Sequence, residues 1–458
     1  MRDWTRRGMM AATASGLVGA GLGGMATTAT AQVPGDRPTK PEGVEVINPR
    51  GRVPISFIID DSTCLVNLAH FCIPQFKEVF PDQYPQPWQT LPREIPDAFV
   101  RKFGEWSREH GVKGKYSIVP YPACVGWVDR DLPGWSKSDL RASLDLVRTL
   151  MMPDWDIHPE MVSHTWAIDT KTGRPYPERT QAFMENWGFS VGKSVDEMAN
   201  YLAFALRILK NAGLTCEGVT TPGGFGSKAR PSLAAGTLDA CRDVFGAEVP
   251  HYFRDLYTDG RSVAPVIYNA SGLNGPDPRC VVSIIGCTAD WFGGWDGLTP
   301  GNVDLLITED GKGGRMPEVI ARGEPAIMVC HWAGLYYNGE EVGFTIFKEA
   351  VKRIHAHHDM LVWMKLSEIA RYWAARELTT IVRRPGRLDL AAPFACPGFT
   401  LKIKAGPEAI PALIGKGEPM PLRRVDRADG VVAGTFYRAG DSVTACFDLP
   451  KGPSVVSI

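Results

Sequence analysis

Acidic residues and histidines recur at the ends of short apolar runs along most of the chain. The apolar run at residues 54–59, for example, is followed directly by two aspartates. Carboxylates and imidazoles can together hold a divalent metal ion, and they can also accept and donate protons during hydrolysis. The residues of this kind that follow apolar runs are Asp60, Asp61, His164, Asp290 and His331.

The elements that must position these residues alternate in the pattern of a parallel α/β fold. Apolar runs at 54–59 and 115–119 flank a helical pattern at 97–110, which is the strand–helix–strand order of a parallel sheet. A long helix is predicted to open at Ser194, where Ser194 and Glu197 form a capping box. About seven strand–helix units predict a distorted (β/α) barrel, whose loops at the carboxyl ends of the strands carry the site. Further strands are predicted at 216–220, 281–285, 326–329 and 360–364, and further helices at 136–151, 229–245, 341–357 and 366–377.

The two ends of the chain have a different character. Residues 1–31 resemble a twin-arginine export signal, because Arg6 and Arg7 precede a weakly apolar stretch that ends in a small-residue cleavage site before Gln32. Residues 32–52 are rich in proline and polar residues and predict a linker, which leaves 53–379 for the barrel. After residue 380 the helical periodicity disappears, and short apolar runs predict a small all-β domain over 380–458.

Composition and the export signal bound the location and the partners. The signal predicts a periplasmic or secreted protein that uses the twin-arginine export machinery and has no stable membrane insertion after cleavage. With 50 Lys+Arg against 51 Asp+Glu, the formal charge of −1 gives no positive field for a phosphate backbone, so nucleic acid is excluded as an expected partner. The ten cysteines include no C-x-x-C pair, and they leave one or two disulfides or buried free thiols as alternatives.

In their order along the chain, the segments at the predicted strand ends resemble the polysaccharide deacetylase (NodB-homology, carbohydrate esterase family 4) superfamily over roughly residues 53–370. The resemblance implies a metal-dependent hydrolase that removes acetyl or other acyl groups from a carbohydrate or a related amide or ester. It implies Asp60 as catalytic base and His331 as general acid, with Asp290 orienting or charging that histidine. It also implies Asp61 and His164 as metal ligands. The segments are Asp60-Asp61, Ser163-His164-Thr165-Trp166, Thr221-Pro222-Gly223-Gly224, Asp290-Trp291 and Cys330-His331-Trp332.

The third metal ligand departs from the family pattern, which has a second histidine four residues after the first. That position is Ile168 here, and Asp169 beside it is the predicted third ligand, provided that the segment is a loop. Zinc is the expected ion, with cobalt, manganese or nickel as alternatives, because a second carboxylate makes the ligand set harder. A second departure is Thr221, which stands where the family has an arginine that restrains the catalytic aspartate.

Aromatic residues and a Pro-Gly turn near these segments predict a surface for the substrate, because aromatic faces pack against sugar rings. Two other functions stay open from the sequence. One is a noncatalytic carbohydrate-binding barrel, and the other is a glycoside hydrolase that uses paired carboxylates such as Asp60 and Asp290 without a metal. The predicted substrate-binding residues are Trp166, Pro222, Gly223, Trp291, Trp332 and Tyr336.

Overall fold

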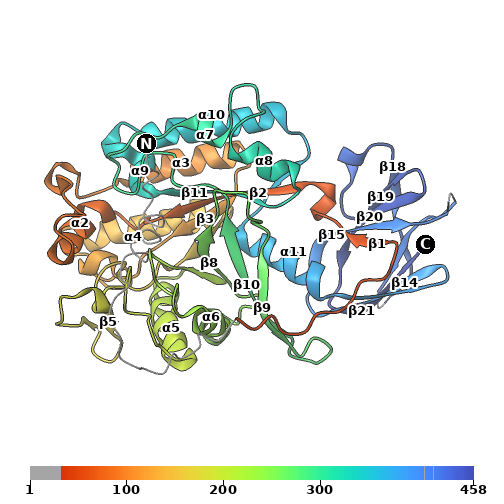
Figure 1. The fold of residues 1–458 in the computed structure, drawn as a ribbon, viewed down its shortest axis with the longest axis horizontal. Helices are drawn as coiled ribbons and strands as arrows, with labels where there is room; N and C mark the ends of the chain where they lie inside the picture. Colours follow the sequence, from red (N-terminus) through yellow and green to blue (C-terminus); the bar gives the residue numbers. More distant parts are fainter. Residues whose placement is uncertain (1–31, 407, 416) are drawn as a thin grey trace, which may run out of the picture.

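The computed structural model of the protein describes residues 32–406, 408–415 and 417–458 (Figure 1). The predicted export signal at 1–31 lies outside these residues. Within the described part of the chain, every helix is too short or too polar to cross a bilayer. All ten cysteines lie in the described part and are free thiols, nine of them buried.

Parallel strands in two sheets form the α/β region. The first sheet has the strand order β11-β2-β3-β4, with β12 also paired to β2, and the second has the order β7-β8-β10-β9. Only β9 runs antiparallel to its neighbour among these strands. The strands are β2 (Val53–Asp60), β3 (Gly114–Ser117), β4 (Trp155–His158), β7 (Gly218–Thr220), β8 (His251–Leu256), β9 (Val266–Ser271), β10 (Arg279–Gly286), β11 (Ala326–His331) and β12 (Leu361–Trp363).

The two sheets meet at two seams. At one seam Glu160, just beyond β4, forms an isolated parallel bridge with Thr220 of β7. At the other, the N–H of Cys287 donates to the carbonyl of Ile327 over 2.8 Å. The predicted distorted barrel therefore corresponds to two apposed sheets, and over the described residues no continuous ladder closes them into one barrel.

Successive side chains along the strands point alternately outward, toward the helices, and inward, toward a partly polar interior. Phe57 of β2 points outward and stacks on Phe347 of α10, with ring centroids 4.2 Å apart. Its neighbours Ser56 and Ile58 belong to the opposite face, because successive strand residues point to opposite sides. The helices of this region are α2 (Leu68–Val79), α3 (Asp97–Glu109), α4 (Lys137–Leu146), α5 (Val195–Asn211), α6 (Arg230–Phe245), α7 (Val303–Leu306), α8 (Arg315–Ala321), α9 (Trp332–Tyr336), α10 (Val342–His357) and α11 (Leu366–Leu378).

Two five-stranded sheets make up the C-terminal region, with the orders β1-β15-β20-β19-β18 and β13-β14-β21-β16-β17. Helix α11 lies between these sheets and the α/β region, and one apolar core includes residues from all three (Figure 1). Strand β1 comes from the segment predicted as a linker, so that segment is in part a strand of the C-terminal region. The strands are β1 (Val44–Val46), β13 (Thr380–Arg384), β14 (Arg387–Ala392), β15 (Cys396–Lys404), β16 (Ala412–Ile414), β17 (Met420–Pro421), β18 (Arg423–Val425), β19 (Thr435–Ala439), β20 (Ser442–Leu449) and β21 (Gly452–Ser457).

Candidate metal and acid–base site

Three buried side chains bring possible metal-ligand atoms together at the carboxyl ends of β2 and β4. They are Asp61, Glu160 and His164, whose ligand atoms all lie within 4.8 Å of one another. Nε2 of His164 is 2.7 Å from Oδ1 of Asp61 and 3.5 Å from Oε1 of Glu160. We call these three residues the upper group.

Backbone and side-chain donors fix the two carboxylates of the upper group. Oε2 of Glu160 accepts the N–H of Asp61 over 2.8 Å and the hydroxyl of Ser117 over 3.1 Å, which leaves Oε1 directed toward His164. Asp61 has a φ of 61°, in the left-handed region that costs energy for residues other than glycine. The strained turn after β2 therefore aims the Asp61 carboxylate at His164.

A buried carboxylate holds the loop that carries His164. Glu185 accepts the backbone N–H groups of Val162, Ser163 and His164 over 3.0, 3.1 and 2.6 Å, and it also accepts the hydroxyl of Tyr201. Burial raises the pKa of Glu185 to about 7, although these hydrogen bonds oppose the shift. Sequence reasoning missed this residue, which positions His164 through the backbone of its loop.

Asp169, the predicted third ligand, lies elsewhere. It sits in β5 (Ile168–Asp169), which pairs with β6 (Arg174–Pro175). Its carboxylate accepts the N–H of Lys171 over 3.0 Å and the hydroxyl of Thr172 over 3.1 Å. The structure thus replaces Asp169 by Glu160, because β4 ends at residue 158 and makes Glu160 the acidic residue at that strand end.

Asp60 is held by a lysine that the sequence analysis did not single out. Nζ of Lys115 lies 2.7 Å from Oδ1 of Asp60, and the two side chains are 0% and 1% exposed. Lys115 also donates to the carbonyl of Ile59 over 2.9 Å and to Ser117 over 2.7 Å. This buried ion pair supplies, from the neighbouring strand β3, a cation beside Asp60 that Thr221 does not provide.

His331 and Asp290 form a hydrogen-bonded pair, and His331 lies beside Asp60. Nδ1 of His331 lies 2.7 Å from Oδ2 of Asp290, and His331 is the register partner of Asp60 in the ladder between β11 and β2. Burial by itself lowers the pKa of His331, but the carboxylates of Asp61, Asp290 and Asp60 outweigh it and raise that pKa overall. With its side chain 13% exposed, His331 is more accessible than any member of the upper group.

Two of the predicted substrate-binding aromatics belong to the interior instead. Trp332 is 1% exposed, and its ring packs on Phe99, Phe103 and Tyr116 at centroid distances of 4.8, 5.4 and 5.3 Å. Trp166 is 4% exposed. Neither ring has a free face for a sugar.

The other predicted substrate-binding residues are placed differently from one another. Trp291 and Tyr336 are partly exposed and pack against the edge of the main core. Pro222 and Gly223 are buried in the turn after β7, where the guanidinium of Arg254 donates to the carbonyl of Gly223 over 3.2 Å. Of this set, Trp291 and Tyr336 keep surface for a ligand.

The donors of the upper group fit a divalent metal ion. Two carboxylate oxygens and one imidazole nitrogen match the ligands that zinc and related first-row ions take in catalytic sites, where further positions stay open for water and substrate. The Cys72 thiol of α2 lies 3.8 Å from Nδ1 of His164, so α2 covers the group on that side. The residues that would hold the ion are those of the upper group.

Comparison with known proteins gives only distant similarities. No protein-family model matches the chain, and no curated protein matches it. A probable polysaccharide deacetylase from Pseudomonas aeruginosa PAO1 is 11% identical, with 71% of this chain and 91% of that chain aligned and a TM-score of 0.38. Puue allantoinase is 13% identical, with 74% and 94% aligned and a TM-score of 0.38. An α-L-fucosidase is 10% identical, with 90% and 98% aligned and a TM-score of 0.24.

These identities and TM-scores are too low to support a function. A functional argument therefore rests on the geometry of the side chains. The protein is thus a mixed α/β protein with a parallel sheet and a candidate metal group at the carboxyl ends of its strands. The hydrogen-bonded pair of His331 and Asp290 lies near that group.

Proposed function

We propose that this protein is a metal-dependent hydrolase that cleaves an amide or ester bond and releases an acyl group from a carbohydrate or related substrate. The observation that supports it is the placement of the acid pair, His331 and Asp290, and of Asp60 beside the upper group. A metal group alone can simply store an ion or stabilise a fold. A metal group with a base and an acid next to it has the parts that hydrolysis needs.

Each part has a defined role in the proposed reaction. A divalent ion in the upper group would lower the pKa of a bound water and polarise the substrate carbonyl. Asp60, oriented by Lys115, takes the proton of the attacking water. The imidazolium of His331, kept charged by the nearby carboxylates, returns a proton to the leaving nitrogen or oxygen.

The same contacts disfavour glycoside cleavage by Asp60 and Asp290. That reaction needs one of the two carboxyl groups to be protonated, so that it can act as an acid. Here Asp60 is 2.7 Å from Lys115 and Asp290 is 2.7 Å from His331. Each carboxylate is therefore already engaged by a basic side chain, an arrangement that suits a base or an orienting residue rather than a proton donor.

Acetate release and metal content, measured on the same samples, test the proposal. Acetylated sugar esters and N-acetylated amino sugars serve as substrates, before and after treatment with a chelator. We expect activity that chelation removes and a divalent ion restores. Glu160→Gln should lose one equivalent of metal and the activity, whereas Asp169→Asn should keep both. Activity that survives chelation, or a metal content unchanged by His164→Ala, would contradict the proposal.

We also propose export by the twin-arginine route to the periplasm or the medium, which rests on residues 1–31. Cell fractionation and N-terminal sequencing should find an exported chain that starts at Gln32. Replacing Arg6 and Arg7 together by lysine should leave the full-length precursor in the cytoplasm. An exported chain that keeps its first residues would instead indicate a different route.

A further inference from the structure

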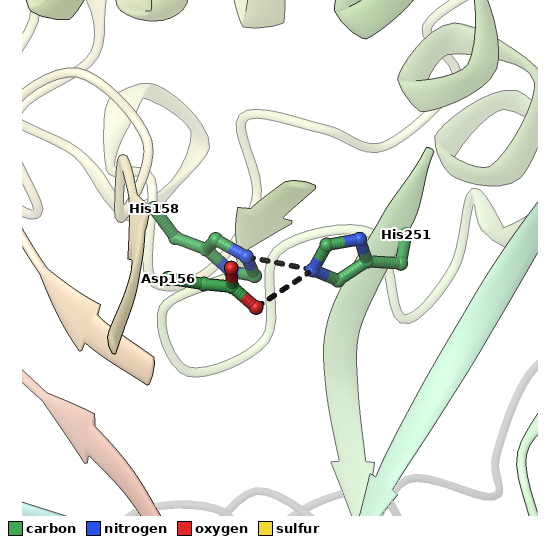
Figure 2. A group of neighbouring side chains, drawn as sticks. All are labelled: Asp156, His158 and His251. Carbon is green, nitrogen blue, oxygen red and sulfur yellow. Dashed lines mark hydrogen bonds and ion pairs between the residues drawn. The ribbon is translucent and has the colours of Figure 1, made fainter. Parts of the chain in front are cut away.

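A second group of side chains that could bind a metal lies inside the α/β region (Figure 2). It consists of Asp156 and His158 from β4 and His251 from β8, and their ligand atoms lie within 4.8 Å of one another. We call it the lower group. Ser367 of α11 donates its N–H and its hydroxyl to Asp156 over 2.6 and 2.8 Å.

Helix α11 shows which end of the strands the Asp156 side of the lower group faces. The N–H of Met364, just before α11, donates to the carbonyl of Ile55 over 3.0 Å, near the amino end of β2. Because Ser367 in the first turn of α11 contacts Asp156, the Asp156 side of the lower group faces the amino end of β2, whereas His158 is the last residue of β4 and precedes Glu160 by two residues. The lower and upper groups share no residue.

The distances within the lower group suit one shared ion. Nε2 of His158 and Nε2 of His251 are 2.9 Å apart, and Nε2 of His251 is 4.0 Å from Oδ2 of Asp156 (Figure 2). With metal–nitrogen bonds of about 2.05 Å, nitrogens at this separation subtend about 90° at the ion, the angle of neighbouring octahedral ligands. The 4.0 Å separation is also shorter than two such bonds, so an ion bound to His251 can also reach Asp156.

Neighbouring groups fix the ligands as outer-shell partners do in metal sites. Nδ1 of His158 lies 3.2 Å from the hydroxyl of Thr220, which leaves Nε2 for the interior, and Ser367 orients Asp156. Burial lowers the pKa of His158 well below its usual range and that of His251 to about 4. The hydrogen bonds with Thr220 and Ser367 thus hold two of the three ligands in place.

A glycine provides the space where the two imidazoles converge. A Cβ on Gly218 of β7 would lie 2.6 Å from Nε2 of His251 and 2.7 Å from Nε2 of His158. A glycine inside a strand weakens it and often marks a place where a ligand approaches the backbone. Gly218 thus keeps open the point toward which both nitrogens are directed.

A cavity of about 670 Å³ gives access from the side of the C-terminal region, with Glu217, Lys365 and Ser367 in its wall. Since Ser367 also bonds Asp156, the cavity comes within one side chain of the lower group. Nζ of Lys365 is 3.8 Å from Oδ1 of Asp156, and the side chain is 25% exposed. An incoming cation must displace this ammonium group from Asp156, and the cavity has room for the displaced side chain.

We propose that Asp156, His158 and His251 form a second, structural site for a divalent first-row transition ion such as zinc, cobalt or nickel. The ion would join β4 of the first sheet to β8 of the second, across β7. This site does not depend on the proposed hydrolase activity.

Metal counting on the full chain tests the proposal. Chelated protein is loaded with Zn²⁺ or Co²⁺, desalted and analysed for metal and protein. We expect two equivalents in the wild type, one in His164→Ala, one in His251→Asn and none in the double variant. Gly218→Ala keeps all three ligands but fills the space between them, so it should also bind one. Co²⁺ bound to His164→Ala should give the visible absorption of a nitrogen-ligated ion, and the same variant should gain thermal stability on loading.

The outcomes separate this proposal from the proposed function. If His251→Asn and Gly218→Ala bind as much metal as the wild type, the lower group is only a hydrogen-bonded histidine pair and the proposal is overturned. If instead His164→Ala keeps the wild-type count while His251→Asn lowers it, the lower site stands and the upper one falls. Should His251→Asn fail to fold, Gly218→Ala and the absorption spectrum of His164→Ala decide.

Discussion

The upper and lower groups contain the same kinds of side chain inside one α/β region, but the chain builds them differently. Asp61, Glu160 and His164 all lie beyond strand ends. Asp61 and His164 themselves have left-handed backbone, and the His164 loop depends on Glu185. The lower group comes directly from β4 and β8, and Thr220 and Ser367 orient His158 and Asp156. Loops can be adjusted to a substrate, whereas strands are fixed by their pairing. The difference suits chemistry at the upper group and structure at the lower group.

The largest expected effect is a loss of turnover in a variant that keeps the metal content of the upper group. His331→Ala removes the proposed acid without removing a member of the upper group, so kcat should fall by about 10²- to 10⁴-fold. Steady-state kinetics with parallel metal analysis measure both quantities, and the metal content should stay at the wild-type value. His355→Ala, on an exposed histidine of α10, is the matched control. A kcat close to the wild type would assign the acid role to another residue.

The buried ion pair of Lys115 and Asp60 should have the largest effect on stability. Lys115→Met leaves Asp60 buried without its cation, which should lower the free energy of unfolding by about 3–5 kcal/mol. Adding Asp60→Asn removes the unpaired charge and should recover most of that loss. Urea unfolding of both single variants and the double variant measures the coupling. Equal losses in the single Lys115→Met and the double variant would show that the pair does not act as a unit.

Removing the Glu185 carboxylate, which holds the His164 loop, should weaken metal binding at the upper group and leave the lower group unchanged. In Glu185→Gln an amide NH₂ replaces one of the accepting oxygens beside three backbone donors, so the free energy of unfolding should fall by about 1–3 kcal/mol. Metal affinity at the upper group should fall by about 10- to 100-fold, as for other outer-shell changes. Titration of His251→Asn protein isolates this site, and exposed Glu178→Gln is the control. An unchanged affinity would mean that other contacts hold the loop.

The smallest effect concerns pH. The pKa of His331 is raised, so its acid form persists as pH rises, and activity is lost only when the pH passes that raised pKa. Asp290→Asn removes one of the raising charges, so the alkaline limb of the kcat–pH profile should move down by about one unit. The measurement is a pH–rate profile of both metal-loaded proteins. A limb that stays in place would belong to a group other than His331.

Much of the fold was predictable because it depends on local pattern. The helices at α3, α5, α10 and α11 begin and end within a few residues of their predicted limits, and the capping box of Ser194 and Glu197 is confirmed. Strand β8 was missed, because His251, Arg254 and Asp255 interrupt any apolar run there. Helix α2, with Pro74 inside it, was missed as well.

The candidate site was predictable only where residues directly follow strands. The side chains of Asp61 and His164 are in contact, as expected for residues that follow the ends of parallel strands, and so are those of Asp290 and His331. Glu160 was not predicted, because β4 already ends at His158 and Glu160 precedes the Ser163-His164 segment on which the resemblance rests. Lys115 sits within a predicted strand, and its partner Asp60 follows only from the register of β2 and β3. Contacts between strands that are distant in sequence depend on tertiary packing, which one sequence does not encode locally.

Strand β1 has a consequence for how the chain matures. It pairs with β15, and nearby the N–H of Arg50 donates to the hydroxyl of Thr400, 350 residues further along the chain. At about 5–20 residues per second, synthesis of that span takes roughly 20–70 s, during which β1 has no partner. The C-terminal region can therefore form its complete sheet only once nearly the whole polypeptide has left the ribosome. A chain truncated before β15 would leave β1 as an unpaired edge, open to association with other chains.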